Sequence, residues 1–174
     1  NIISFVDARQ LKAENMVKLP VIVYNRKSQE DVFISAVSLR RKLELEAVQG
    51  QKNGGKYIRP IVLFQAQPKN NADSTTYEKI KHTLMEMGIP ESEIAIKTAD
   101  KDELKNIDLS SSDCNIRYII TINALKEGWD CPFAYILATV ANRTSSIDVE
   151  QILGRILRLP NTKKNESEVL NLSY

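Results

Sequence analysis

The chain has 174 residues, of which 43% are hydrophobic and 26% are charged, a composition typical of a globular domain and not of a disordered segment. With 24 Lys and Arg against 22 Asp and Glu, the formal net charge is +2, which excludes a protein whose whole surface is a polycation. The apolar runs are far shorter than the roughly 20 residues that a membrane-spanning helix needs. The chain begins at Asn1 without an initiator methionine or a signal peptide, so we expect it to be a piece of a longer protein.

The predicted elements alternate between short apolar runs and amphipathic segments, which is typical of an α/β domain with a mostly parallel central sheet flanked by helices. The predicted strands are residues 21–24, 61–64, 94–96, 118–122 and 135–138. The predicted helices are residues 29–48 and 74–87, with Asp73 or Ser74 capping the second helix and Gly88 with Pro90 ending it. Residues 49–56 are predicted to be a turn-rich loop.

The chain divides into three predicted parts. Residues 21–160 form the domain, residues 1–20 form a strap that enters from a preceding domain, and residues 161–174 form a polar, truncated tail. Cys114 and Cys131 are too few for a disulfide framework, so we expect reduced thiols and a cytoplasmic protein. The single histidine, His82, fits the polar side of a surface helix, and the sequence predicts no metal site.

The first segment with candidate chemistry runs from Asn123 to Pro132, directly after a predicted strand. Because ligands gather outside the carboxyl ends of parallel strands, we expect this turn to lie where a binding site would be. Gly128 can end a one-turn helix, and Asp130 is then held on a stiff turn where its carboxylate can accept hydrogen bonds from ribose hydroxyls. The alternative is a structural role, with a helix C-cap, an Asx turn and a packed Trp129.

The second segment runs from Ser145 to Pro160 and is predicted to be one amphipathic helix that Pro160 ends. At about 100° per residue, Gln151, Arg155 and Arg158 lie together on the face opposite the apolar stripe. A solvated helix face is the alternative, but Gly154 costs about 1 kcal/mol in a helix interior and would let a ligand approach the backbone. Two forked guanidinium groups that lack acidic neighbours on the helix suit a polyphosphate.

These residues resemble the motifs of superfamily 2 helicases and translocases. The pattern Gln151-x-x-Gly154-Arg155-x-x-Arg158 resembles motif VI, residues 123–130 followed by Cys131 and Pro132 resemble motif V, and residues 60–68 are similar to motif IV. The sequence of residues 124–132 is most similar to that of the Res subunit of type III restriction enzymes. Over residues 20–160, the resemblance implies a RecA-like three-layer fold, the second motor domain of an ATP-dependent DNA translocase.

The resemblance also implies roles for individual residues. Arg158 would be the arginine finger and Arg155 a second contact to the γ-phosphate, because such groups stabilise the charge that develops during phosphoryl transfer. Gln151 would help to order the nucleotide, and Gly128, Asp130 and Gly154 would shape its site. The residues expected to contact the nucleic-acid backbone are Thr121, Asn123, Ser74 and Thr75, followed by Gln65, Gln67 and Lys69. Many members have a threonine where this chain has Ile122, so the identity of the contacting residue in motif V stays open.

The sequence lacks the other half of a nucleotide site. No G-x-x-x-x-G-K-[ST] pattern and no DEAD- or DEAH-like acidic pair occurs in it. The resemblance therefore implies that ATP with Mg²⁺ is bound mainly by a preceding RecA-like domain of the same chain, and that these residues alone are not a complete ATPase. It further implies that double-stranded DNA and a methyltransferase or recognition subunit are partners, and that no membrane is involved. The carboxylates of an endonuclease site would lie further along the chain.

Two alternatives remain open from the sequence. One is the motor domain of a DNA-repair helicase or an RNA helicase of the same superfamily. The other is an α/β binding module without motor activity, in which the arginines form a protein-binding patch. A phosphate-binding lysine and an acidic magnesium box ahead of Asn1 in the encoding gene would favour the motor.

Overall fold

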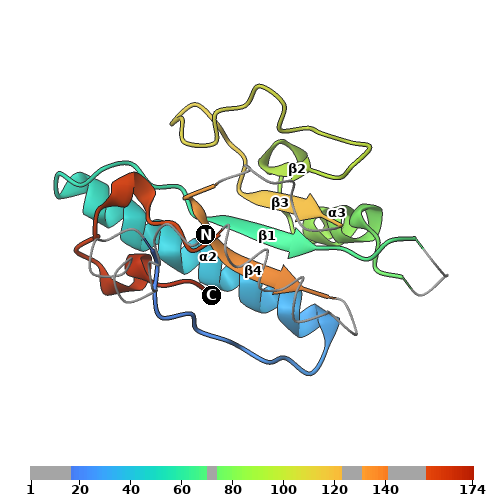
Figure 1. The fold of residues 1–174 in the computed structure, drawn as a ribbon. Helices are drawn as coiled ribbons and strands as arrows, with labels where there is room; N and C mark the ends of the chain where they lie inside the picture. The colour runs from blue at the N-terminus through green and yellow to red at the C-terminus, as the bar shows by residue number, and fades with distance from the viewer. Residues whose placement is uncertain (1–16, 70–73, 123–130, 141–155) are drawn as a thin grey trace, which may run out of the picture.

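The computed structural model describes residues 17–69, 74–122, 131–140 and 156–174 (Figure 1). Their helices and strands, in chain order, are α2 (Gln29–Lys52), β1 (Ile61–Gln65), α3 (Tyr77–Glu86), β2 (Ile94–Ile96), β3 (Tyr118–Thr121) and β4 (Ala134–Thr139). Short 3₁₀ turns follow at η1 (Glu91–Glu93), η2 (Pro160–Thr162) and η3 (Glu168–Asn171). Within this part of the chain, no helix is both long and apolar enough to cross a membrane.

The four strands form one sheet in the order β2-β3-β1-β4, and every pair is parallel. Leu63 and Phe64, neighbours on opposite faces of β1, are both completely buried, as expected of a parallel sheet covered on both sides. On one face, Phe33 of α2 stacks on Phe64 with ring centroids 5.1 Å apart. The result confirms the predicted α/β class and is consistent with a RecA-like three-layer fold.

The strand predicted over residues 21–24 is wrong. Val21 forms only an isolated bridge to Ser173, and the side chains of Val23 and Tyr24 are 85% and 53% exposed. The free edge of β4 is instead taken by Tyr174, whose N–H donates to the Tyr135 carbonyl at 2.9 Å. The predicted polar tail is therefore part of the fold, and Leu170 within it is completely buried.

Both described helices have clear start and stop signals. The Ser28 hydroxyl caps α2, and the Thr76 hydroxyl, not Asp73 or Ser74, caps α3. Each helix ends in a Schellman motif with a glycine at positive φ, Gly54 at 90° and Gly88 at 82°. Gly88 was predicted to help end its helix. Because α2 continues to Lys52, the predicted loop over residues 49–56 begins four residues later than expected.

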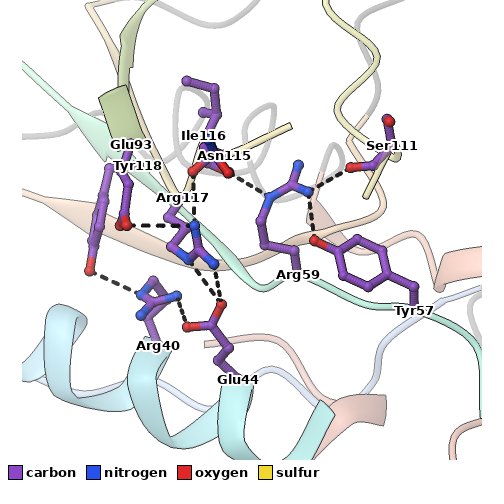
Figure 2. A network of polar contacts seen from close by, with 10 residues as sticks. All are labelled: Arg40, Glu44, Tyr57, Arg59, Glu93, Ser111, Asn115, Ile116, Arg117 and Tyr118. Carbon is purple, nitrogen blue, oxygen red and sulfur yellow. Dashed lines mark hydrogen bonds and ion pairs between the residues drawn. The ribbon is translucent and has the colours of Figure 1, made fainter. Parts of the chain in front are cut away.

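A network of charged side chains joins α2 to the amino ends of the strands (Figure 2). The Glu44 carboxylate accepts hydrogen bonds from Arg40 at 2.7 Å and from Arg117 at 2.9 Å. Arg40 also donates to the Tyr118 hydroxyl at 3.0 Å, and Arg117 lies 3.6 Å from a Glu93 carboxylate oxygen. One half-buried carboxylate thus fixes the helix against the starts of β2 and β3.

Arg59, which precedes β1, organises the long connection between β2 and β3 (Figure 2). Its buried guanidinium donates to the carbonyls of Leu109 at 2.6 Å, Ser111 at 2.8 Å and Ile116 at 2.8 Å, and to the Tyr57 hydroxyl at 3.0 Å. Such charge-assisted hydrogen bonds satisfy backbone groups that no helix or strand satisfies in this connection. A single side chain therefore holds the loop that packs beside the sheet.

The first prediction concerns Glu44. Burial alone would raise the pKa of its carboxyl, but the hydrogen bonds and charges of Arg40 and Arg117 together hold that pKa below its ordinary value of 4.5. A lowered folded-state pKa stabilises the fold above pH 4.5, and this contribution is lost as the pH falls through the folded-state value. We expect Glu44→Gln to lower the unfolding free energy by about 1–3 kcal/mol at neutral pH, with the difference from wild type shrinking below pH 4.5.

Urea unfolding followed by circular dichroism between pH 3 and 7 checks this prediction, with the exposed Glu166→Gln as the control for loss of one carboxylate. A difference between wild type and Glu44→Gln that stays constant over the whole pH range would contradict it.

Candidate functional site

Three polar side chains form a row where the strands end. Gln65, the last residue of β1, pairs in register with Thr121 of β3 on one side and with Thr139 of β4 on the other. Residues paired in a parallel sheet point to the same face, so the three side chains share one face at its carboxyl edge. Gln65 and Thr121 are 6% and 2% exposed, and the Gln65 Oε1 atom is a buried acceptor without a hydrogen-bond partner in the described chain.

The row lies at the switch point of the topology. After β1 the chain crosses through α3 to β2, beyond β3, whereas after β3 it leads to β4, beyond β1. Ligands of open α/β sheets bind at the carboxyl ends of the two strands that separate such opposite crossings, which here are β1 and β3. Two of the predicted nucleic-acid residues, Gln65 and Thr121, end those two strands.

The loop after β1 is tied back to this edge by a chain of hydrogen bonds. Gln67 and Thr75 exchange two bonds of 2.8 Å, one from the Gln67 N–H to the Thr75 carbonyl and one from the Thr75 N–H to Gln67 Oε1. The Thr75 hydroxyl donates to Gln29 Oε1 at 3.1 Å, and Gln29 Nε2 donates to the Val140 carbonyl at 3.2 Å. Lys79 Nζ donates to the Ser74 carbonyl at 2.8 Å. The starts of α2 and α3 and the end of β4 are thereby linked.

The predicted nucleic-acid residues that the structure describes are therefore brought together, but they differ in accessibility. Gln65, Ser74, Thr75 and Thr121 are buried, Gln67 is half-buried, and Lys69 is exposed. The arrangement can present the ammonium of Lys69 to an anionic ligand, while the buried hydroxyls and amides support the edge from behind. Asn123 lies outside the described residues.

A second cluster surrounds Arg158, at the other end of the sheet. The Lys18 ammonium donates to the Arg158 carbonyl at 2.7 Å and to the Pro132 carbonyl at 2.9 Å, and it lies 4.5 Å from the centroid of the Tyr135 ring. Val17 and Arg158 form an antiparallel bridge. Pro132 and Arg158, each near the end of a segment with candidate chemistry, therefore meet at Lys18.

Of the helix predicted over residues 145–159, the structure describes residues 156–159, and only Ile156 among them is helical, so Arg158 is not helical. Two physical reasons account for this end. Pro160 has no N–H to donate to the Ile156 carbonyl, and the Leu157 carbonyl accepts from the Lys18 N–H instead of from a helical donor. The prediction that Arg158 shares a helix face with Gln151 and Arg155 is therefore wrong, and those two residues lie outside the described residues.

The location of Pro132 also corrects an expectation. Residues 123–132 were expected near the carboxyl ends of the strands, but Cys131 and Pro132 lie at the amino end of β4, and the Phe133 carbonyl accepts from the first N–H of β1 at 2.8 Å. The reason is topological, because β3 and β4 are parallel and the chain between them must return to the starting edge. Cys131 is buried, as predicted.

The remaining predicted nucleotide residues, Gly128, Asp130, Gln151, Gly154 and Arg155, also lie outside the described residues. Arg158 is exposed, and its backbone carbonyl accepts a hydrogen bond from the Lys18 ammonium. Among the described residues, no cluster of three His, Cys, Asp or Glu side chains could hold a metal ion. His82 is exposed on α3 and lies 3.3 Å from Glu86, as expected for a surface residue.

An apolar groove of about 520 Å³ lies between α2, β4 and residues 21–24. The exposed side chains of Val23, Tyr24 and Ile34 are among its lining residues. The Arg26 guanidinium in this lining donates to the Ser35 hydroxyl at 2.7 Å. With one paired cation and mostly apolar walls, the groove has the character of a packing surface and not of a catalytic site.

Lys18 and Gln29 contribute to these clusters and Arg59 holds the connection between β2 and β3, but none of the three was predicted from the sequence. Each bonds to residues more than 40 positions away, so no local spacing reveals its role. The only available signal was a single cation next to an apolar run, at Lys18 and at Arg59, and many surface residues share that pattern.

Comparison of the chain with protein-family models and with curated proteins found no match in either set.

The second prediction tests the polar link behind the carboxyl edge. Gln67→Leu removes the acceptor of the buried Thr75 N–H, so we expect the unfolding free energy to fall by about 1–3 kcal/mol. Urea unfolding measures the loss, and Gln51→Leu, an exposed glutamine near the end of α2, is the matched control. Equal stability of the Gln67 and Gln51 variants would show that this hydrogen bond does not support the edge.

Proposed function

We propose that this chain is the second RecA-like motor domain of an ATP-dependent DNA translocase or helicase of superfamily 2, most similar to the Res subunit of type III restriction enzymes. The observation that carries the proposal is the meeting of Pro132 and Arg158 at the Lys18 ammonium. These two residues end the segments that resemble motifs V and VI, and a shared nucleotide site requires such segments to converge.

The separation of the two clusters also supports a motor. The polar row and Lys69 occupy the carboxyl edge of the sheet, and Arg158 lies beside the amino end of β4. A motor needs one surface for the nucleotide and another for the nucleic acid. The domain between them must move as a rigid body so that a change at one surface shifts the other. A connected hydrogen-bonded sheet between the two clusters provides that body.

In this proposal, hydrolysis of ATP drives movement. A preceding domain of the same chain would make most of the contacts to ATP and Mg²⁺. The exposed Arg158 guanidinium reaches across the cleft and stabilises negative charge that develops on the transferred phosphoryl group. Arg155, Gln151, Gly154, Gly128 and Asp130 complete this side of the cleft. Opening and closing of the cleft then moves the carboxyl edge relative to the other domain.

Double-stranded DNA is the proposed nucleic-acid partner at the carboxyl edge. Lys69 and Gln67 can contact its sugar-phosphate backbone, which carries no sequence information, so recognition would come from a separate methyltransferase subunit. A DNA-repair or RNA helicase of the same superfamily would use the same edge. Comparing the affinities for DNA and RNA duplexes distinguishes a DNA-directed from an RNA-directed motor.

A non-motor binding module is the second candidate, and the burial of Thr75 and Thr121 favours it. Hydroxyls that are buried in the domain do not reach a nucleic acid unless the edge opens. A module of this kind would show no ATP turnover in the full-length protein, so the following experiment separates the two candidates.

The third prediction concerns Arg158 in the full-length protein. Arg158→Ala removes the proposed transition-state contact, so we expect DNA-stimulated ATP hydrolysis to fall by at least about 100-fold while ATP binding changes little. Steady-state ATPase kinetics measure the loss, and Arg41→Ala on the exposed side of α2 is the control. Turnover at the wild-type rate in Arg158→Ala would remove the arginine-finger role.

The fourth prediction concerns Lys69. If its ammonium lies against a phosphate, Lys69→Ala should weaken binding to all duplex sequences alike and reduce the slope of log affinity against log salt concentration by about 1. Fluorescence anisotropy with DNA and RNA duplexes of one sequence, measured from low to physiological salt, provides the slopes. Lys42→Ala, an exposed lysine of α2, should keep the wild-type slope, and an unchanged slope for Lys69→Ala would place the nucleic acid elsewhere.

A further inference from the structure

Lys18 is a completely buried cation at the point where three parts of the chain meet. Its ammonium bonds to the carbonyls of Pro132 and Arg158, and the aliphatic stem leads it to within 4.5 Å of the Tyr135 ring centroid. A buried ammonium is costly unless its N–H groups are satisfied, so the carbonyls that satisfy it are held firmly in place. This side chain therefore fixes the distance between the Pro132 and Arg158 backbones.

The backbone of Lys18 adds to the same junction. Its N–H donates to the Leu157 carbonyl, and its own carbonyl accepts from the Ser173 hydroxyl at 3.2 Å. Together with the bridge between Val17 and Arg158, these bonds hold residues 157 and 158 against residues 17 and 18. The position of the Arg158 Cα atom is thus set by residue 18 from both its backbone and its side chain.

We propose that Lys18 is the positioning residue for Arg158, and that it connects the segment preceding the domain to the nucleotide side of the cleft. The inference rests on the proposed function, in which Arg158 acts on the transferred phosphoryl group. Lys18 itself touches no nucleotide in this scheme. It acts through the carbonyl groups of Arg158 and Pro132, so a displacement of residues 17 and 18 moves the arginine.

Removal of the ammonium should therefore affect the transition state more than nucleotide binding. Lys18→Met keeps the length of the stem and its packing on Tyr135 but leaves two carbonyl acceptors without their donor. The segment 156–160 is then released from Pro132, and a guanidinium that is misplaced by about 1 Å can cost up to about 100-fold in rate. Because most contacts to the nucleotide lie in the other domain, KM should change little.

The test compares Lys18→Met with Lys27→Met in the full-length protein. Lys27 is exposed and lies on the same N-terminal segment, so its variant controls for loss of one positive charge there. Hydrogen exchange with mass spectrometry measures the protection of peptides covering residues 131–137 and 156–162. ATPase kinetics measure kcat and KM separately, and urea unfolding reports global stability.

We expect Lys18→Met to exchange at least about tenfold faster in both peptides, and kcat to fall at least about tenfold with KM within about twofold. Lys18→Arg, which retains a cationic donor, should recover part of both effects. Where Lys18→Met does not fold, the same comparison is made with Lys18→Gln, whose amide keeps one of the two carbonyl bonds.

The outcomes separate this inference from the proposed function. Unchanged exchange in both peptides overturns the role of Lys18, whatever the ATPase activity. Faster exchange with unchanged kcat in an active protein also overturns it, because Arg158 would then not need this support. Faster exchange in a protein whose wild type shows no ATP turnover supports the structural role of Lys18 and overturns the motor function instead.

Discussion

Parallel strand pairing is the constraint on which the rest of the structure depends. Each connection between parallel strands must carry the chain from the carboxyl edge of the sheet back to the amino edge. The segment between β3 and β4 therefore begins beside Thr121 at one edge and ends beside Pro132 at the other. The polar row at the carboxyl edge and the junction around Arg158 at the amino end of β4 are consequences of this one rule. The sheet between them is almost entirely apolar and buried on both faces, so the two clusters are held by a stiff core.

The amino edge shows how loops without regular structure are held. Arg59 precedes β1, and Lys18 packs against the residues that precede β4, so the two buried cations lie beside neighbouring strands. Phe133 links them, because the Arg59 guanidinium lies 5.9 Å from its ring centroid and Pro132 next to it accepts from Lys18. Each cation donates to backbone carbonyls that are far from it in the sequence. Charge-assisted bonds of this kind replace the helix or strand ladders that would otherwise satisfy those carbonyls.

The sequence predicted four of the strands because a strand buried on both faces is a nearly continuous apolar run, and residues 61–64 and 118–122 have that composition. Residues 21–24 have the same composition but form no strand. A strand also needs a free edge to pair with, and the edge of β4 is taken by Tyr174. Composition reports what a segment can bury and says nothing about which partner is available. The same limit applies to the end of the predicted helix, where Pro160 signalled a stop but the contact of Leu157 with Lys18 set the last helical residue at Ile156.

The residues of the candidate site came from the resemblance to superfamily 2 motifs, which named Gln65 and Thr121. The strand register then places these two residues side by side at the carboxyl edge. Their burial was not predictable, because it depends on loops that fold over the edge through contacts such as that between Thr75 and Gln29. Lys18 was beyond the reach of any spacing argument, since its acceptors lie 114 and 140 positions away. Lys18 links the two segments that resemble motifs V and VI. The resemblance points to Arg158, and the tertiary structure shows that Lys18 holds its backbone.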